Sequence, residues 1–272
     1  MRDIENLEIE LLLEGIFQRY GIDFRGHVRE PLRRKLREYM HGNGLTTVSA
    51  LQESVLHDAG AGERLMRSLS ARPAALYDDA AHFRALRDVL GSWLRSSPAP
   101  RIWIAECAAA EDVFGLAILL HEEGLLERTQ LYATSANESL LADAARGRIA
   151  AARIADYEAG YRAAGGRKSL SDYLVRDGDE AAFLPELSAG VTWSQYNLAT
   201  DASFNEFELI LCREPLAEFG PALRRRALHL FHDSLARFGI LSLPALEDAA
   251  SEPLLAGYTS VLRQPGLYRR VL

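Results

Sequence analysis

Apolar residues recur at helical spacing through the first third of the chain. The first predicted helix is carried by Leu7, Ile9, Leu11, Leu12, Ile16 and Phe17. Pro31 opens a second helix that Asn43-Gly44 closes, and a third follows Thr46 and Thr47. Asp79 is placed to cap a further helix that runs to Leu94, ahead of the turn at 96–100. Residues 1–95 are therefore predicted to be an all-helical domain with a linker helix.

Strands and helices alternate after Pro100. Short apolar runs predict strands at 101–105, 130–134, 191–196, 208–212 and 240–243. Longer amphipathic runs predict helices at 111–123, 137–146 and 221–238, and the last 16 residues, 257–272, suit a hairpin that turns at Gln264-Pro265-Gly266. The segment 147–190 interrupts this alternation, which indicates an insertion with its own small substructure. The pattern over 96–272 predicts an α/β fold with a largely parallel sheet.

Composition narrows the class of protein. The 272 residues are 48% hydrophobic and carry a net charge of −7, which is typical of a folded globular protein and disfavours nucleic acid as a partner. Two cysteines, Cys107 and Cys212, suggest free, inert thiols in a reducing compartment. No run approaches the roughly 20 apolar residues that span a bilayer, and the first residues do not resemble an export signal. A cytoplasmic protein without membrane insertion is expected.

Several short motifs occur in a fixed order along the chain. They lie at 79–86, 102–103, 116–120, 132–134, 165–173, 197–198, 209–213 and 230–235. Together they resemble the CheR-type chemotaxis receptor methyltransferases, which transfer a methyl group from S-adenosylmethionine to glutamate side chains of chemoreceptors. The resemblance implies a helical N-terminal domain, a Rossmann-like methyltransferase domain at 96–272, and a small antiparallel β-subdomain inserted at about 147–190.

The positions at which the resemblance places the cofactor are altered. The family's loop Ala-Gly-Cys-Ser-Thr-Gly-Glu-Glu reads Ala-Glu-Cys-Ala-Ala-Ala-Glu-Asp at 105–112, so both glycines that let backbone approach a ligand are gone. Ser135 stands in place of the family's ribose-binding aspartate, and Glu214 in place of an asparagine. The implied cofactor positions are Ala74, Ala105, Glu106, Ala110, Glu111, Ser135, Asn197, Leu198 and Glu214.

Both implied substrate-facing positions have changed as well. Asp78 replaces the family's arginine and Glu218 replaces a tyrosine, so no intact catalytic residue is expected. The exchange turns attraction for a carboxylate into repulsion, and each such contact at about 4 Å is worth roughly 4 kcal/mol before screening. We therefore predict a CheR-like protein that has lost cofactor binding and methyl transfer, and that acts by binding a chemoreceptor or another signalling protein.

Two alternative functions stay open. The first is an active protein-glutamate O-methyltransferase, in which the altered pocket still binds S-adenosylmethionine or S-adenosylhomocysteine, with Glu111 at the amine and Asn197 and Leu198 at the adenine. The second is a sensor of another nucleotide, such as a cyclic dinucleotide, although no arginine-rich recognition motif is evident.

Three surfaces have both a functional and a structural interpretation. A basic helix face is predicted to bind an acidic partner or simply to be solvated, and it comprises Arg29, Arg33, Arg34 and Arg37. Six acids would surround the cleft, either as a cation site or as the filling of an abandoned pocket: Asp78, Glu106, Glu111, Asp112, Glu214 and Glu218. We expect no metal, because no histidine or cysteine has ligand spacing. The insertion at 147–190 could add a peptide strand at its edge, or be only a packed subdomain.

Overall fold

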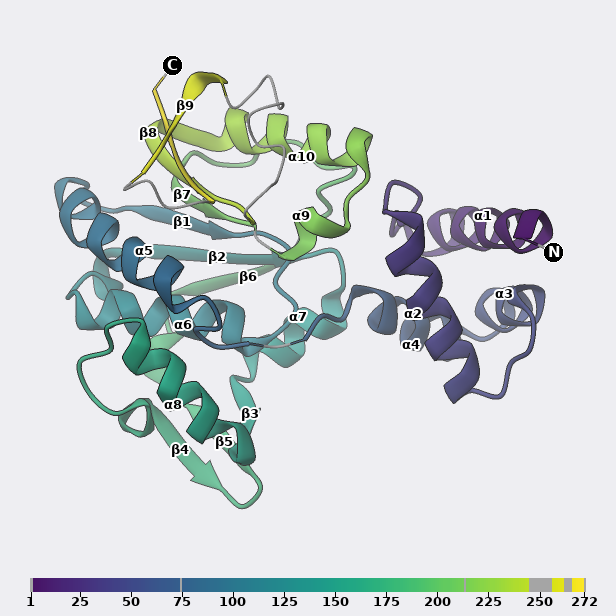
Figure 1. The fold of residues 1–272 in the computed structure, drawn as a ribbon, viewed down its shortest axis with the longest axis horizontal. Helices are drawn as coiled ribbons and strands as arrows, with labels where there is room; N and C mark the ends of the chain where they lie inside the picture. Colours follow the sequence, from purple (N-terminus) through teal and green to yellow (C-terminus); the bar gives the residue numbers. More distant parts are fainter. Residues whose placement is uncertain (1, 74, 213, 245–255, 262–265, 272) are drawn as a thin grey trace.

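The computed structural model describes residues 2–73, 75–212, 214–244, 256–261 and 266–271. Its N-terminal part is a bundle of four helices, α1 (Arg2–Tyr20), α2 (Arg29–Gly42), α3 (Val48–His57) and α4 (Ala59–Ser70). Thr47 and Asp58 cap α3 and α4 by accepting hydrogen bonds from backbone N–H groups in their first turns. The bundle has a core of its own and lies beside the rest of the molecule (Figure 1).

A seven-stranded sheet forms the centre of the larger part. Its strand order is β6-β2-β1-β7-β8-β10-β9. The strands in that order are β6 (Val191–Gln195), β2 (Gln130–Ser135), β1 (Arg101–Ile104), β7 (Phe207–Leu211), β8 (Leu235–Ser242), β10 (Leu267–Arg270) and β9 (Tyr258–Ser260). The first five pair in parallel, and β10 and β9 pair antiparallel. The predicted α/β fold with a largely parallel sheet is confirmed.

Helices cover both faces of this sheet (Figure 1). On one face lie α5 (Ala80–Trp93), α6 (Ala110–Glu122) and α7 (Glu138–Ala145); on the other lies α10 (Pro221–Ser234). Side chains alternate along β1 accordingly: Ile102 and Ile104 are buried toward the first group, and Trp103 toward α10. The helix α5, which the sequence grouped with the N-terminal helices, packs against the sheet domain.

The segment that interrupts the alternation is a small subdomain. It contains a three-stranded antiparallel sheet and the helix α8 (Ile154–Ala163). The strand order is β3 (Arg148–Ala150), β5 (Glu180–Phe183) and β4 (Leu174–Asp177). This is the inserted antiparallel β-subdomain that the resemblance implied. Short 3-10 helices cover Leu94–Ser96, Leu126–Arg128, Ala151–Arg153, Leu170–Tyr173 and Pro185–Leu187.

A cluster of charged and phenolic side chains attaches the subdomain to α6. The Glu122 carboxylate pairs with Arg87 at 2.6 Å and accepts hydrogen bonds from the hydroxyls of Tyr161 and Tyr173. Burial raises the pKa of Glu122, but the hydrogen bonds from Tyr161, from the Arg167 backbone and from Arg87 together hold it below its ordinary value. Arg167 also pairs with Glu123 at 2.5 Å.

The C-terminal third departs from the sequence prediction in one place. The helix predicted at 221–238 ends at Ser234, because Leu235 begins β8, is buried, and pairs with Phe207 of β7. Phe238 then takes a φ of 65° at an irregularity in that strand pair. The expected C-terminal hairpin has its two strands paired, while its turn residues 264 and 265 lie outside the described residues. Among the described helices, none is long and apolar enough to cross a membrane.

Candidate functional site

A cleft lies where the strand order reverses, between β1 and its neighbour β7. Chain segments that follow β1, β2, β6 and β7 meet there, as expected for a ligand site at the carboxyl ends of a parallel sheet. The cleft has two compartments, of about 40 Å³ and about 200 Å³. Arg72, Glu106 and Pro215 line both of them, so these residues form the partition.

Glu106 occupies the partition with a strained backbone. It is the second residue after β1 and has a φ of 56°, in the left-handed region that favours glycine. Its Oε2 lies 3.5 Å from the backbone nitrogen of Ala136, and the Leu198 N–H also stabilises its charged form. Burial raises the pKa of Glu106 to about 7, against the lowering effects of Arg72 and of these N–H groups. Arg72 also donates to the Glu106 carbonyl oxygen.

This side chain limits the space that a nucleotide could use. A left-handed residue with a Cβ costs about 1–2 kcal/mol, whereas the glycine found here in the family would adopt the same φ freely and leave the cleft empty of side chain. The compartment next to Asn197 and Leu198 holds about 40 Å³, room for only a few waters. Pockets for ligands of nucleotide size are usually some 300–1,000 Å³. With Glu106 in this position, the smaller compartment stays well below that size, and the adjoining larger compartment holds about 200 Å³.

The loop before α6 is held by an acid in the first turn of that helix. Asp112 Oδ2 accepts hydrogen bonds from the backbone nitrogens of Ala108 at 2.8 Å and Ala109 at 3.1 Å. These N–H groups are therefore engaged within the loop and are not free to hold an anion. Glu111 is buried, and its Oε1 accepts from the Tyr157 hydroxyl of α8 at 2.6 Å. Ala105 and Ala110 are buried on either side of the loop.

Ser135, at the end of β2, lines neither compartment of the cleft. Its hydroxyl accepts from the backbone nitrogen of Asn137 at 3.2 Å, and the cleft is lined instead by the next residue, Ala136. Asn197 does line the cleft, but its side chain is also engaged: Nδ2 donates to the carbonyl of Gly21 in the helical bundle at 3.3 Å, and Oδ1 accepts from Ala199. Leu198 is buried beside it.

The two positions predicted to face the substrate lie in different compartments. Asp78 lines the larger one with Glu106, Glu111 and Asp112, while Glu218 lines the smaller one. The ring of acids predicted around one cleft is thus divided between two spaces. Of the remaining predicted residues, Ala74 lies outside the described residues and Glu214 begins the helix α9 (Glu214–Glu218). Within the described ranges, no group of histidines, cysteines and acids is arranged to hold a metal.

Glu218 holds the helical bundle against the sheet domain. Its carboxylate pairs with Lys35 Nζ of α2 at 2.8 Å, and the same ammonium donates to the Leu69 carbonyl. The backbone nitrogen of Val28 donates to the Glu218 carbonyl at 2.8 Å, and that of Gly220 to the Gly26 carbonyl at 2.8 Å. The sequence missed Arg72 as a site residue and did not indicate that Lys35 pairs with Glu218, because neither residue belongs to a motif that points to the cleft.

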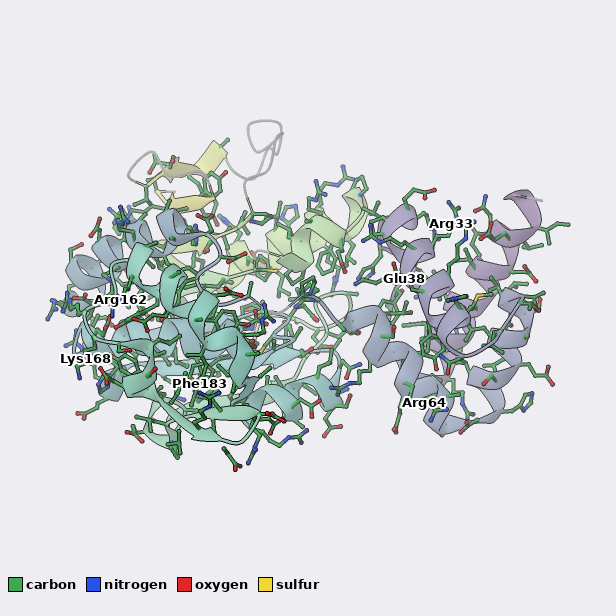
Figure 2. The ribbon with its side chains drawn as sticks, turned by 60° about the horizontal axis from the view of Figure 1, so that its bottom comes forward. Arg33, Glu38, Arg64, Arg162, Lys168 and Phe183 are labelled. Atoms are coloured by element: carbon green, nitrogen blue, oxygen red, sulfur yellow. The ribbon has the colours of Figure 1, made fainter. Side chains whose placement is uncertain are left out.

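Most of the predicted basic helix face is neutralised within the bundle. Arg33 pairs with Glu30, Arg37 with Glu5, and Arg34 approaches Glu38 at 3.8 Å. Arg33 and Glu38 are labelled on α2 in Figure 2. Arg29 is exposed, and among the described residues it has no ion pair. These arginines therefore provide less free positive charge than their sequence spacing predicted.

Neither cysteine is arranged for chemistry. Cys107 and Cys212 are both free and buried. Burial raises the pKa of each thiol well above its ordinary value, so neither is a thiolate at neutral pH. His27, which lines the smaller compartment, has its pKa lowered to about 4, chiefly by burial, and is neutral there.

The fold and the position of the cleft define a Rossmann-like domain, and the family models define it as a methyltransferase domain. Residues 7–70 match the family model described as the CheR methyltransferase all-alpha domain, and residues 74–254 match the CheR methyltransferase SAM-binding domain. The chain belongs to the CheR methyltransferase family. Because the second match is to a SAM-binding domain, it does not support the expectation that no cofactor binds.

Individual relatives agree with this assignment. A protein of Pseudomonas putida named as a methyltransferase, Cher3, is 36% identical over 265 residues, which is 97% of both chains. Chemotaxis protein methyltransferase 1 of Pseudomonas aeruginosa is 24% identical, over 97% of this chain and 98% of its own. Among solved structures, the N-methyltransferase NodS of Bradyrhizobium japonicum with S-adenosyl-L-homocysteine is 13% identical, with a TM-score of 0.41, over 82% of this chain and 95% of its own.

Proposed function

We propose that this CheR-family protein has lost methyl transfer and acts in chemosensory signalling by binding a chemoreceptor or another signalling protein. The observation that carries the proposal is the position of the Glu106 carboxylate in the cofactor cleft. That carboxylate accepts a hydrogen bond from the Ala136 N–H group and, with Arg72, separates the two compartments. A bound cofactor would have to displace it.

Two further changes favour the same function. Asp78 introduces a negative charge into the larger compartment, where the substrate of the family is itself a glutamate side chain. Like charges at contact distance repel by about 4 kcal/mol at an effective dielectric near 20. Glu218, the other altered position, is used for the ion pair with Lys35 that joins the two parts of the chain. Its role is to hold the bundle in place.

An active protein-glutamate O-methyltransferase is the second candidate. It is favoured by the match of residues 74–254 to a SAM-binding domain and by the larger compartment of about 200 Å³, which Glu111 and Asp112 still line. In that case Glu106 would have to leave the partition when the cofactor binds. Methyl transfer itself would need mainly close positioning of the two reactants.

The test is calorimetric titration of the full chain with S-adenosylhomocysteine, followed by a methyl-transfer assay on chemoreceptors with labelled S-adenosylmethionine. The proposal expects no heat at millimolar ligand and no label on the receptor, together with receptor binding in a pull-down of purified components. Micromolar binding, about −8 kcal/mol, together with label on receptor glutamates, would establish the second candidate instead.

A further inference from the structure

An apolar stripe runs along the solvent-facing side of α1. Ile4, Leu7 and Leu11 are 66%, 56% and 51% exposed, and their spacing of three and four residues places them on one helix face. The opposite face, with Ile9, Leu12, Leu13 and Ile16, is buried in the bundle core. The stripe therefore has no packing role within the described chain.

The stripe is large compared with the rest of the described surface. Only seven large hydrophobic residues are exposed there, and three of them form this stripe. Exposed apolar side chains scattered singly are ordinary, whereas a contiguous row marks a contact site. A groove of about 520 Å³ continues it at Ile4 and runs between α1 and α2, lined by Leu36 and Met40 among others. Side chains of a bound helix could enter this groove.

The charge beside the stripe is negative. Glu10 and Glu14 follow Leu7 and Leu11 by three residues, so they flank one side of the row. Both acids are exposed; Glu14 pairs with Arg25 at 2.7 Å, while Glu10 makes no ion pair or hydrogen bond with any described residue. Over its whole length α1 carries five acidic and two basic residues, a net charge of −3.

We propose that the α1 stripe binds an amphipathic helix of a partner protein whose apolar row is flanked by lysine or arginine. Charge decides between this occupant and a second copy of the chain. Two α1 helices packed antiparallel on their stripes would bring the Glu10 side of each helix together, which is unfavourable. A basic flank instead complements Glu10, which has no ion pair among the described residues. The helix α1 belongs to the bundle (Figure 1), and Ile4, Leu7 and Leu11 line neither compartment of the cleft, so the proposal does not depend on the fate of the cleft.

The probe is a synthetic peptide of about 25 residues, long enough to be helical, with leucines at heptad spacing and lysines beside them. Fluorescence anisotropy with the full-length protein is expected to show saturable binding. The same peptide with glutamates in place of the lysines is expected to bind at least tenfold more weakly. Leu7→Gln and Leu11→Gln should each weaken binding of the lysine peptide about tenfold or more, because each exposes a polar group within the apolar row.

Two controls make the result specific. Val175→Gln, on β4, alters a valine of 57% exposure far from α1 and should leave peptide binding unchanged. Glu10→Lys should weaken the lysine peptide and strengthen the glutamate peptide. Equal binding of both peptides, or full binding by Leu7→Gln with an unchanged melting temperature, would overturn the proposal. So would sedimentation showing a wild-type dimer that Leu7→Gln dissociates, because the occupant would then be a second copy.

Discussion

Replacing Glu106 with glycine tests whether this side chain closes the cofactor cleft. The substitution removes a left-handed strain of about 1–2 kcal/mol at a φ of 56°. It also removes the hydrogen bonds that the carboxylate accepts from Ala136 and Leu198, worth about 1 kcal/mol each. At pH 5, where the buried Glu106 carboxyl is protonated, these terms nearly cancel, so the free energy of unfolding of Glu106→Gly should stay within about 1 kcal/mol of the wild type.

The effect on ligand binding should be much larger than the effect on stability. A ligand entering the wild-type cleft must break the same two hydrogen bonds and move a carboxylate past Arg72. Removing that requirement is worth about 2–3 kcal/mol, or roughly 30- to 150-fold in the dissociation constant. Calorimetric titration with S-adenosylhomocysteine should therefore detect binding by Glu106→Gly where the wild type shows little.

A glutamine at the same position distinguishes the effect of the Glu106 charge on ligand binding from the effect of the side chain's volume. Glu106→Gln keeps the side chain in the cleft and should gain less affinity than Glu106→Gly. The reasoning would be refuted if the wild type and Glu106→Gly bound S-adenosylhomocysteine equally, whether tightly or not at all. Equal gains from glycine and glutamine would show that charge, and not the occupied space, excludes the ligand.

The raised pKa of Glu106 also predicts how stability depends on pH. The folded-state pKa of about 7 exceeds the unfolded value of 4.5, so the contribution of this group is fully present below pH 4.5 and is lost as the pH rises through 7. Relative to Glu106→Gln, the wild type should lose up to about 3 kcal/mol of stability between pH 5 and pH 8. Urea unfolding of both proteins at the two pH values measures this, and parallel curves would contradict it.

Three further substitutions test how the domains are held together, each by urea unfolding. Lys35→Met should cost about 2–4 kcal/mol by leaving the partly buried Glu218 carboxylate unpaired, and Glu218→Leu in the same protein should restore part of the loss. Glu122→Gln should cost about 3 kcal/mol at neutral pH. The cost should be smaller at low pH: Glu122 has a lowered pKa in the folded protein, so its contribution to stability is lost as the pH falls below about 4.5. Gly220→Ala should cost about 2 kcal/mol, because the added Cβ would lie 2.8 Å from a backbone oxygen. Gly42→Ala should not destabilise the protein, because the space around Gly42 is open. Equal effects of the two alanines would contradict the close approach at Gly220.

Local patterns predicted most of the secondary structure correctly. The strand at 101–105 and the helix at 111–123 appear as β1 and α6 within one residue, because a continuous apolar run and a capped apolar helix are local signals. The helix predicted at 221–238 failed in its last turn. There, pairing of Leu235 with β7 and burial of its side chain outweighed the helical pattern.

The site was predictable as a set of positions, but its contacts were not. The sequence placed Glu106, Asp78 and Asn197 around one cleft from the family's motif order, and all three line its compartments. It did not indicate that the Ser135 hydroxyl binds the backbone of Asn137, or that Glu218 pairs with Lys35. The Glu218 contact joins residues 183 positions apart in the chain.

The sequence by itself determined the family, the order of helices and strands, and the loss of the glycines in the loop after β1, because each is a property of neighbouring residues. Tertiary structure alone decided which way the substituted side chains turned. Glu106 lies in the cleft because the segments that follow β2 and β6 place the N–H groups of Ala136 and Leu198 there. Where a buried carboxylate finds its hydrogen bonds depends on strands far apart in the chain, and only the folded sheet brings those strands together.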